Sequence, residues 1–130
     1  MAQIKTVYPS GNTLYFLLTR ETSNHYWNDN ISGWEGYDAA NISGYATSMA
    51  EDGNVGVYRG TFPSHTNVVS GEYTVVLKRQ VGANIIEGDT PIGLENYYWD
   101  ETDIYGSAIQ DVDAIKAVID KLDTMIEIVV

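Results

Sequence analysis

The sequence predicts a mainly β protein, with an antiparallel β-sandwich over residues 1–100, a linker over 101–107 and a C-terminal α-helix over 108–130. Between about residues 3 and 99, apolar and polar residues alternate with a period of two, which is typical of strands. Gly, Asn, Asp and Pro interrupt this pattern roughly every ten residues, as in two-sheet β folds. After Gly106 the apolar spacing changes to three and four residues, which indicates a helix.

The segment 13–20 is the clearest candidate for a central strand. Its apolar residues lie on both faces, Leu14, Phe16 and Leu18 on one and Tyr15 and Leu17 on the other. Because both faces are apolar, we expect this strand to be covered on both sides. After a polar turn at 21–24, residues 25–28 predict a short returning strand, which ends at another turn over 29–33.

Three further segments complete the predicted sheets. The pair Asp52-Gly53 stands between the alternating segments 45–49 and 55–62 and predicts a hairpin, because both residues accept positive φ. Residues 72–79 predict a strand with a polar outer face. Its expected inward residues are Tyr73, Val75 and Leu77. A last strand is predicted over 92–99.

The C-terminal segment carries a heptad pattern. Ser107 and Gln110 match a helix-initiating capping box. Six aliphatic residues then recur at alternating spacings of three and four: Val112, Ile115, Ile119, Leu122, Ile126 and Val129. β-Branched residues at the a positions, with Ile at one d position, favour three strands. We expect these six side chains to form an oligomerisation or docking surface, with a homotrimer as the product. The alternative is a single amphipathic helix that lies on its own β domain.

The charge balance excludes several classes of partner. Lys and Arg number 7 against 18 Asp and Glu, which gives a net charge of −11. Because phosphate backbones and anionic lipids are bound by clustered Lys and Arg, we expect neither nucleic acid nor a membrane as partner. Cysteine is absent from the sequence, which excludes disulfides and thiolate metal sites. The N-terminus shows no secretory signal pattern, so we expect synthesis in the cytoplasm without secretion.

A search for catalytic and metal-binding patterns predicts no catalytic residue, no metal and no cofactor. His25 and His65 are the only histidines, and neither belongs to a nucleophile or zinc motif. The carboxylate pairs Glu51-Asp52 and 100–103 adjoin expected turns, where solvated acids are common. Residues 28–33 imitate the first half of an EF-hand loop, but Ala39 stands where the bidentate Glu is required.

Aromatic residues offer one binding chemistry. The chain has 3 Trp and 10 Tyr, and exposed rings of this kind can stack on sugars. Trp34 and Trp99 are the candidates for sugar stacking, although aromatic residues also serve sheet packing. The runner-up function of another class is therefore a carbohydrate-binding module.

Four stretches resemble a known group of proteins. They are YPSGNTLY (8–15), NHYWN (24–28), GNVGVYRGTFP (53–63) and SGEYTVVL (70–77). Together they are similar to a small β domain of virion proteins of tailed bacteriophages, which is often followed by helical or coiled-coil sequence. The segment 71–75 is also similar to the tyrosine-bearing strand of immunoglobulin-like sandwiches, although Val75 stands where those domains carry a cysteine.

The resemblance implies a non-enzymatic structural protein located in the virion. We expect a capsid decoration or cement protein that self-associates and docks on another virion protein, such as the major capsid protein or a tail component. The alternative within the same class is an adaptor at the neck, tail or fibre base. The resemblance supplies no catalytic residues.

Overall fold

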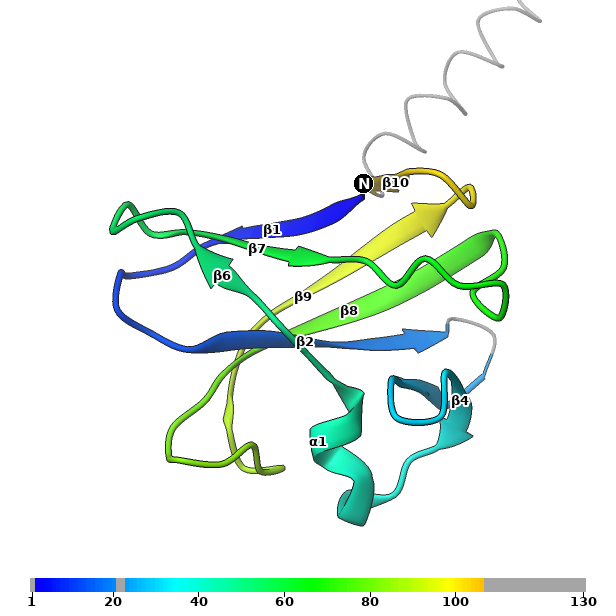
Figure 1. Ribbon diagram of the computed structural model, residues 1–130, viewed down its shortest axis with the longest axis horizontal. Helices are drawn as coiled ribbons and strands as arrows, with labels where there is room; N and C mark the ends of the chain where they lie inside the picture. Colours follow the sequence, from blue (N-terminus) through cyan, green and yellow to red (C-terminus); the bar gives the residue numbers. More distant parts are fainter. Residues whose placement is uncertain (1, 21–22, 107–130) are drawn as a thin grey trace, which may run out of the picture.

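The computed structural model describes residues 2–20 and 23–106, and this part of the chain is mainly β, with two antiparallel sheets and one short α-helix (Figure 1). The first sheet has the order β1-β7-β6. Its strands are β1 (Gln3–Val7), β7 (Val57–Thr61) and β6 (Ala50–Glu51). The second has the order β10-β9-β8-β2-β3-β4, with β5 also paired to β2. Its strands are β2 (Leu14–Arg20), β3 (His25–Asn28), β4 (Gly33–Gly36), β5 (Ala46–Ser48), β8 (Gly71–Arg79), β9 (Thr90–Trp99) and β10 (Ile104–Gly106).

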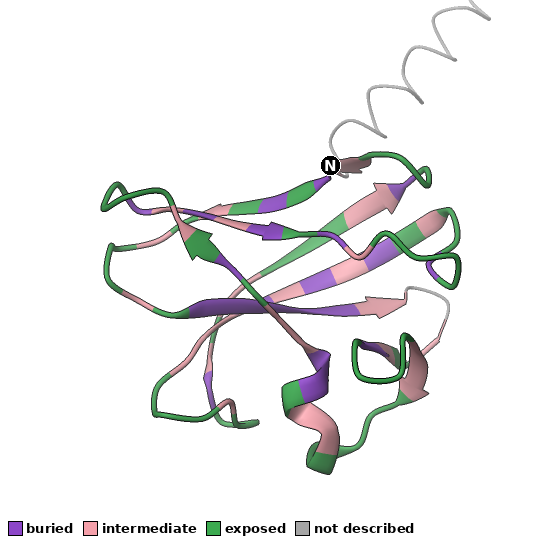
Figure 2. Cartoon of the chain, viewed as in Figure 1, coloured by how far each residue is buried: buried purple, intermediate pink, exposed green. Residues whose placement is uncertain are grey.

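Strand β2 is the centre of the larger sheet, as the sequence predicts. It pairs with β8 along its whole length and with β3 and β5 on its other edge. All residues from Leu14 to Leu18 are buried, and Figure 2 shows this run as the longest buried stretch of strand. The prediction of a strand covered on both faces is confirmed.

The main core lies between the two sheets. Ile4 and Tyr58 contribute from the smaller sheet, and Phe16 and Val75 from the larger one. Gly60 of β7 permits the close approach, because a Cβ there would lie 2.8 Å from Phe16 Cε1. The predicted inward residues of β8 are all in this core: Tyr73, Val75 and Leu77.

A second, smaller core covers the outer face of β2. It consists of Tyr15, Leu17 and Tyr45, with Ile42 and Ile85 packed against them. Tyr45 and Ile42 come from α1 (Ile42–Tyr45), a helix of one turn that follows the 3-10 turn η1 (Ala39–Asn41). Neither element is predicted from the sequence, because one helical turn is too short to show a 3.6-residue period.

The Asp52-Gly53 turn is confirmed, but the first strand of its hairpin is not the predicted segment 45–49. Residues 46–48 form β5 and pair with β2 in the larger sheet, and the short strand β6 pairs with β7 instead. Asp52 and Gly53 form the turn between β6 and β7, with Gly53 at φ +54°. Residues 104–106, expected in a linker, instead form β10 against residues 97–99 of β9. The reason is a tight turn in which the Asp100 N–H donates to the Asp103 carbonyl at 3.1 Å, so the chain returns to the sheet edge.

The predicted helix over 108–130 lies outside the described residues, and so do its six heptad positions. Within the part of the chain that is described, no helix has the length and apolarity needed to cross a membrane.

Candidate functional site

The paired carboxylates of the sequence hold turns in place. The two oxygens of Glu51 accept hydrogen bonds from the N–H groups of Gly11 (3.1 Å) and Gly56 (2.9 Å). A hydrogen bond from the Ser10 side chain, together with these two, lowers the pKa of Glu51. Asp52 forms an ion pair with Arg59 at 2.8 Å. These acids therefore serve the β6–β7 hairpin and do not face each other across a cleft.

The acidic segment 100–103 has the same role at the β9–β10 turn. Asp100 Oδ1 accepts from the N–H groups of Thr102 (2.8 Å) and Asp103 (2.6 Å), and these backbone donors lower its pKa. In the EF-hand-like loop, the Asn28 side chain is buried, and its Nδ2 donates a hydrogen bond to Glu35 Oε1 at 3.0 Å. Among residues 2–20 and 23–106, no cluster of three or more acidic or His side chains is placed to hold a metal ion.

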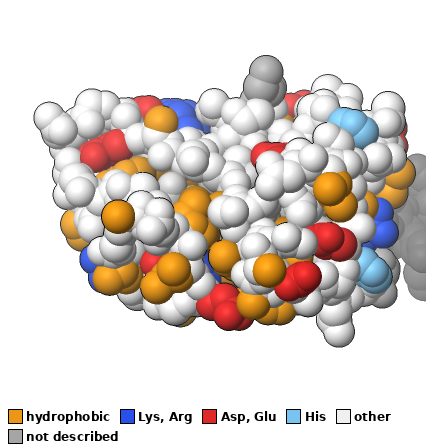
Figure 3. Space-filling view, turned by 60° about the horizontal axis from the view of Figure 1, so that its bottom comes forward, with side chains coloured by type: hydrophobic (Ala, Val, Ile, Leu, Met, Phe, Trp, Pro, Cys, Tyr) orange, Lys and Arg blue, Asp and Glu red, His pale blue; other side chains and the backbone are white. Residues whose placement is uncertain are grey.

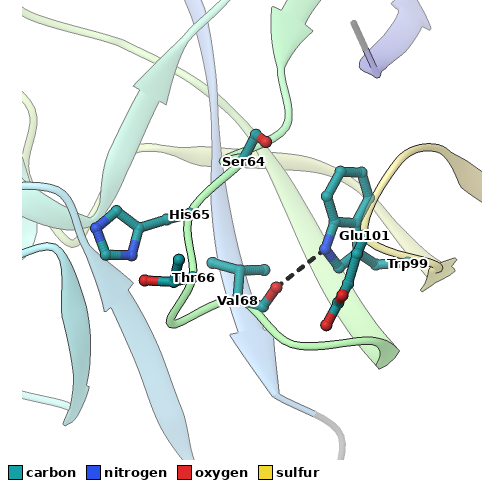
Figure 4. A pocket seen from close by; sticks show the side chains of 6 residues that line it. All are labelled: Ser64, His65, Thr66, Val68, Trp99 and Glu101. Carbon is teal, nitrogen blue, oxygen red and sulfur yellow. Dashed lines mark hydrogen bonds between the residues drawn. The ribbon is translucent and has the colours of Figure 1, made fainter.

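A hollow of about 390 Å³ opens where the loop after β7 crosses the end of β9 (Figure 4). Trp99 Nε1 donates to the Val68 carbonyl at 3.0 Å inside it. The His65 ring points away from Trp99 and Glu101, and His65 Nδ1 accepts from the Asn67 N–H at 3.0 Å. Glu101 Oε1 accepts from the Ser70 N–H at 3.3 Å. The polar groups here hold the loop, and His65 and Glu101 form no acid–base pair.

The two tryptophans predicted to stack on sugars are used for packing. Trp99 is 2% exposed and belongs to the main core, so the prediction that it stacks on a sugar is wrong. Trp34 is partly buried, and its ring stacks on Tyr73 with the ring centroids 5.5 Å apart. The Arg20 guanidinium lies 4.4 Å from the centroid of the same ring. The Trp34 Nε1 donates to the Asn67 carbonyl at 2.8 Å. Contacts within the chain therefore occupy Trp34.

Three tyrosines form a different aromatic surface, near the end of the molecule that carries α1 and β4. The ring of Tyr26 lies 5.2 Å from that of Tyr37 and 5.3 Å from that of Tyr45. The Tyr45 hydroxyl donates to Glu35 Oε1 at 2.7 Å. The Tyr37 hydroxyl donates to the Glu87 carboxylate, and this bond, with burial second, raises the pKa of Tyr37 to about 12. Both hydroxyls are thus fixed, which orients the rings.

The tyrosine pocket is a hollow of about 310 Å³ beside these rings. It is lined by Thr19, Arg20, Ser23, Asn24, Tyr26 and Tyr37. Tyr37 remains 45% exposed. The Ser23 hydroxyl oxygen is buried and has no hydrogen-bond partner among the residues that the structure describes. Within the described residues, the Arg20 guanidinium makes no hydrogen bond or ion pair beyond its contact with Trp34.

The buried Asp89 fixes the loop that carries Glu87. Asp89 is 1% exposed and accepts from the Tyr15 hydroxyl at 2.7 Å, the Val81 N–H at 3.1 Å and the Ile86 N–H at 3.1 Å. Burial raises the pKa of Asp89, but the hydrogen bond from Tyr15, the two backbone bonds and the Lys78 charge outweigh it, so the pKa is lowered. In turn, burial and the bond to Asp89 raise the pKa of Tyr15.

The smaller sheet carries an exposed apolar site at one end. Val7 is 80% exposed and Val55 is 71% exposed, and both line a hollow of about 480 Å³ with Tyr8 and Pro9. We call this site the valine hollow. Apolar side chains grouped on a surface are typical of contact sites, whereas single ones need no explanation.

Sequence reasoning missed both the tyrosine pocket and Asp89. Tyr37 and Asp89 stand in loops, where no period marks them. The one signal present in the sequence is the number of tyrosines, which exceeds what the predicted strands use. Comparisons of the chain with models of known protein families, with curated proteins and with solved structures find no match.

Proposed function

We propose that this chain is a non-enzymatic structural protein of a phage particle, and that its two sheets form an immunoglobulin-like β-sandwich that carries contact surfaces. The observation that supports an assembly role is the valine hollow, because two aliphatic side chains around one hollow are left in water, Val7 at the end of β1 and Val55 in the β6–β7 turn. The carboxylates of Glu51 and Asp100 accept hydrogen bonds from backbone N–H groups in turns, which is a structural use of these side chains.

The proposed contacts are of two kinds. The six heptad residues from Val112 to Val129 pack against sister chains and give a homotrimer. The valine hollow takes an apolar side chain of another virion protein, such as the major capsid protein or a tail component. Three linked copies would bind a threefold site more tightly than one copy, because the second and third contacts become intramolecular.

Mass spectrometry tests the location. The sample is purified phage particles whose genome encodes this chain. The proposal expects the protein in the particles, and its absence from them would overturn the proposal. A copy number close to that of the major capsid protein supports a decoration protein. A far smaller copy number supports the neck, tail or fibre-base alternative.

The self-association is tested with full-length protein by sedimentation equilibrium. A trimer has three times the chain mass of 14.4 kDa. The double variant Ile119→Asp/Ile126→Asp should sediment as a monomer with an unchanged β circular dichroism spectrum. The matched control Ala117→Asp/Thr124→Asp adds the same charge at f positions of the heptad and should stay trimeric. A monomeric wild type, or a trimeric seam variant, contradicts the trimer.

A further inference from the structure

We propose that the free edge of β1 binds an extended segment of another protein as an added antiparallel strand, with an acidic residue of that segment opposite Lys5 and an apolar residue opposite Val7. We call this site the β1 edge. It rests on the proposed function, because it includes the valine hollow, and it specifies the form and charge of the partner. β1 is a margin of the smaller sheet, since within the described residues it pairs with β7 alone.

The backbone of β1 has unpaired groups along this edge. At the end of the β1–β7 ladder the Tyr8 N–H donates to the Gly56 carbonyl at 3.0 Å, so the even-numbered residues of β1 bond to β7. In an antiparallel pair, the residues between them direct their N–H and C=O groups to the other side. The backbone groups of Gln3, Lys5 and Val7 therefore point away from the sheet, and none of them is bonded within residues 2–20 and 23–106.

β1 is the longest regular edge of the two sheets. Its five residues pair with β7 in one register without a bulge. The other marginal strands, β6, β4 and β10, have two, four and three residues. The part of β9 that β10 leaves uncovered contains Pro91, and the β8–β9 register shifts beside it. Proteins protect edges with short strands, proline, bulges and lysine, and of these β1 has only Lys5.

Lys5 defines the charge of the partner strand. Lys5 is exposed and pairs with Arg59 of β7, so the two cations share one face of the sheet. Arg59 forms an ion pair with Asp52, whereas Lys5 forms none within the described residues. Directly opposite residues of an antiparallel pair have Cβ atoms about 5 Å apart, and opposite charges stabilise such a pair. The residue that the incoming strand places opposite Lys5 is therefore Asp or Glu.

The valine hollow defines the apolar position. Val7 is the last residue of β1 and is 80% exposed, and the hollow of about 480 Å³ opens beside it. A strand antiparallel to β1 meets Val7 two positions before it meets Lys5. Read from its N-terminal side, the partner has an apolar residue, any residue, Asp or Glu, any residue and a polar residue opposite Gln3. Burial of the apolar residue adds hydrophobic free energy to the backbone hydrogen bonds of strand addition.

A second copy of this chain fits the β1 edge less well. If two β1 strands paired antiparallel over their full length, Lys5 of one copy would lie opposite Lys5 of the other, and like charges placed so are destabilising. Each chain also carries a net charge of −11, and acidic side chains are spread over the side of the molecule shown in Figure 3. Repulsion between two such chains opposes this contact.

The test is a titration of the ¹⁵N-labelled full chain with a capped peptide of sequence Val-Thr-Glu-Thr-Thr, followed by NMR and amide hydrogen exchange. In the free chain, the amides of Gln3, Lys5 and Val7 should exchange faster than those of Ile4 and Thr6. The peptide should give saturable shifts at residues 3–8 and 54–57, with a Kd on the order of 1 mM because a short peptide loses conformational entropy on binding. At a free peptide concentration of about ten times Kd, exchange of the three fast amides should slow by about tenfold.

Three results would overturn the proposal. Slow exchange of Gln3, Lys5 and Val7 in the free chain would show that the edge is already occupied, by a second copy if protection rises with protein concentration and by another segment of the same chain if it does not. The absence of saturable binding contradicts strand addition. Equal binding of the reversed peptide Thr-Thr-Glu-Thr-Val contradicts the antiparallel direction.

Variants test the two side-chain positions. Lys5→Glu should weaken binding of the peptide about fivefold, because an attractive pair becomes repulsive, and it should prefer a peptide with lysine in place of glutamate. Val7→Ser should weaken binding several-fold. Val81→Ser removes a valine that is 60% exposed in the loop after β8, outside the hollow, and is the matched control. An unchanged peptide preference in Lys5→Glu, or equal binding by the two serine variants, would contradict the assignment.

The titration separates the β1 edge from the proposed function, because it uses the isolated chain. A failed titration with the protein present in particles overturns strand addition alone. Peptide binding by a chain that is absent from particles supports strand addition and overturns the proposed location.

Discussion

Asp89→Asn tests whether one buried carboxylate holds the 80–89 loop over the second core. The carboxylate accepts three hydrogen bonds, and its partner Tyr15 lies 74 positions away in the chain. The substitution keeps the shape of the side chain and removes its charge. Any loss of stability therefore comes from the weakened hydrogen bonds and the lost attraction to Lys78, and not from a cavity.

The magnitude follows from the number of acceptors. Oδ2 of Asp89 serves Tyr15 and Ile86, and Oδ1 serves Val81. An amide has one oxygen, so at least one of these donors would face an NH₂ group. A lost bond to a buried charged acceptor costs about 1.5–3 kcal/mol, and the remaining bonds weaken to neutral ones. We expect a total loss of about 2–4 kcal/mol of unfolding free energy near neutral pH.

The assay is urea unfolding followed by tryptophan fluorescence, with Asp100→Asn as the matched control. Asp100 also accepts two backbone N–H groups and a tyrosine hydroxyl, but it is exposed, and water can replace the lost acceptor. Its variant should lose much less stability. Equal losses in the two variants would refute the reasoning, because burial is the difference between the two sites.

The pH dependence supplies a second check on the same variant. The folded pKa of Asp89 lies below its ordinary value of 3.8, so its contribution is fully present above that pH. The contribution of Asp89 to the unfolding free energy is lost as pH falls through the folded pKa, because the carboxylate binds a proton more readily in the unfolded state than in the folded state. The stability gap between wild type and Asp89→Asn should therefore narrow only below pH 3.8. A gap that narrows at higher pH contradicts the assignment.

Three further predictions follow from single contacts. Gly60→Ala should cost about 1–3 kcal/mol of unfolding free energy in urea, because its Cβ would lie 2.8 Å from Phe16 Cε1; equal stability would show that the sheets separate without strain. Val7→Ser/Val55→Ser should leave stability unchanged, since both residues are exposed, but should abolish co-sedimentation with particles; retained binding excludes the valine hollow as the contact. Trp99→Phe should lose about 1–3 kcal/mol in the same urea assay, because the buried Val68 carbonyl loses its donor.

Local sequence patterns predict the strands that have a two-residue period and a long partner. β8 follows from alternation, β2 follows from a run that is apolar on both faces, and the Asp52-Gly53 turn follows from its φ preference. β10 could not be predicted, because three residues are too few to show a period. Its pairing depends on Asp100, which turns the chain back through two backbone hydrogen bonds.

The aromatic residues show the limit of sequence reasoning about the site. Trp99 and Tyr37 are both large aromatic residues next to polar sequence, yet one is 2% exposed and the other 45%. Their exposure is set by what packs over them. Phe62 lies 4.8 Å from Trp99 between ring centroids, and it comes from the chain segment after β7. No local pattern contains that information.

The sequence by itself determined that the described body is built from antiparallel strands and which face of β8 is apolar, because alternation is a property of neighbouring residues. Only the tertiary structure decided that Asp89 is buried, that Trp99 is in the core and that Tyr37 and Ser23 line one pocket. The physical reason is that burial and hydrogen-bond satisfaction arise between segments far apart in the chain, whereas sequence patterns report only what lies close along it.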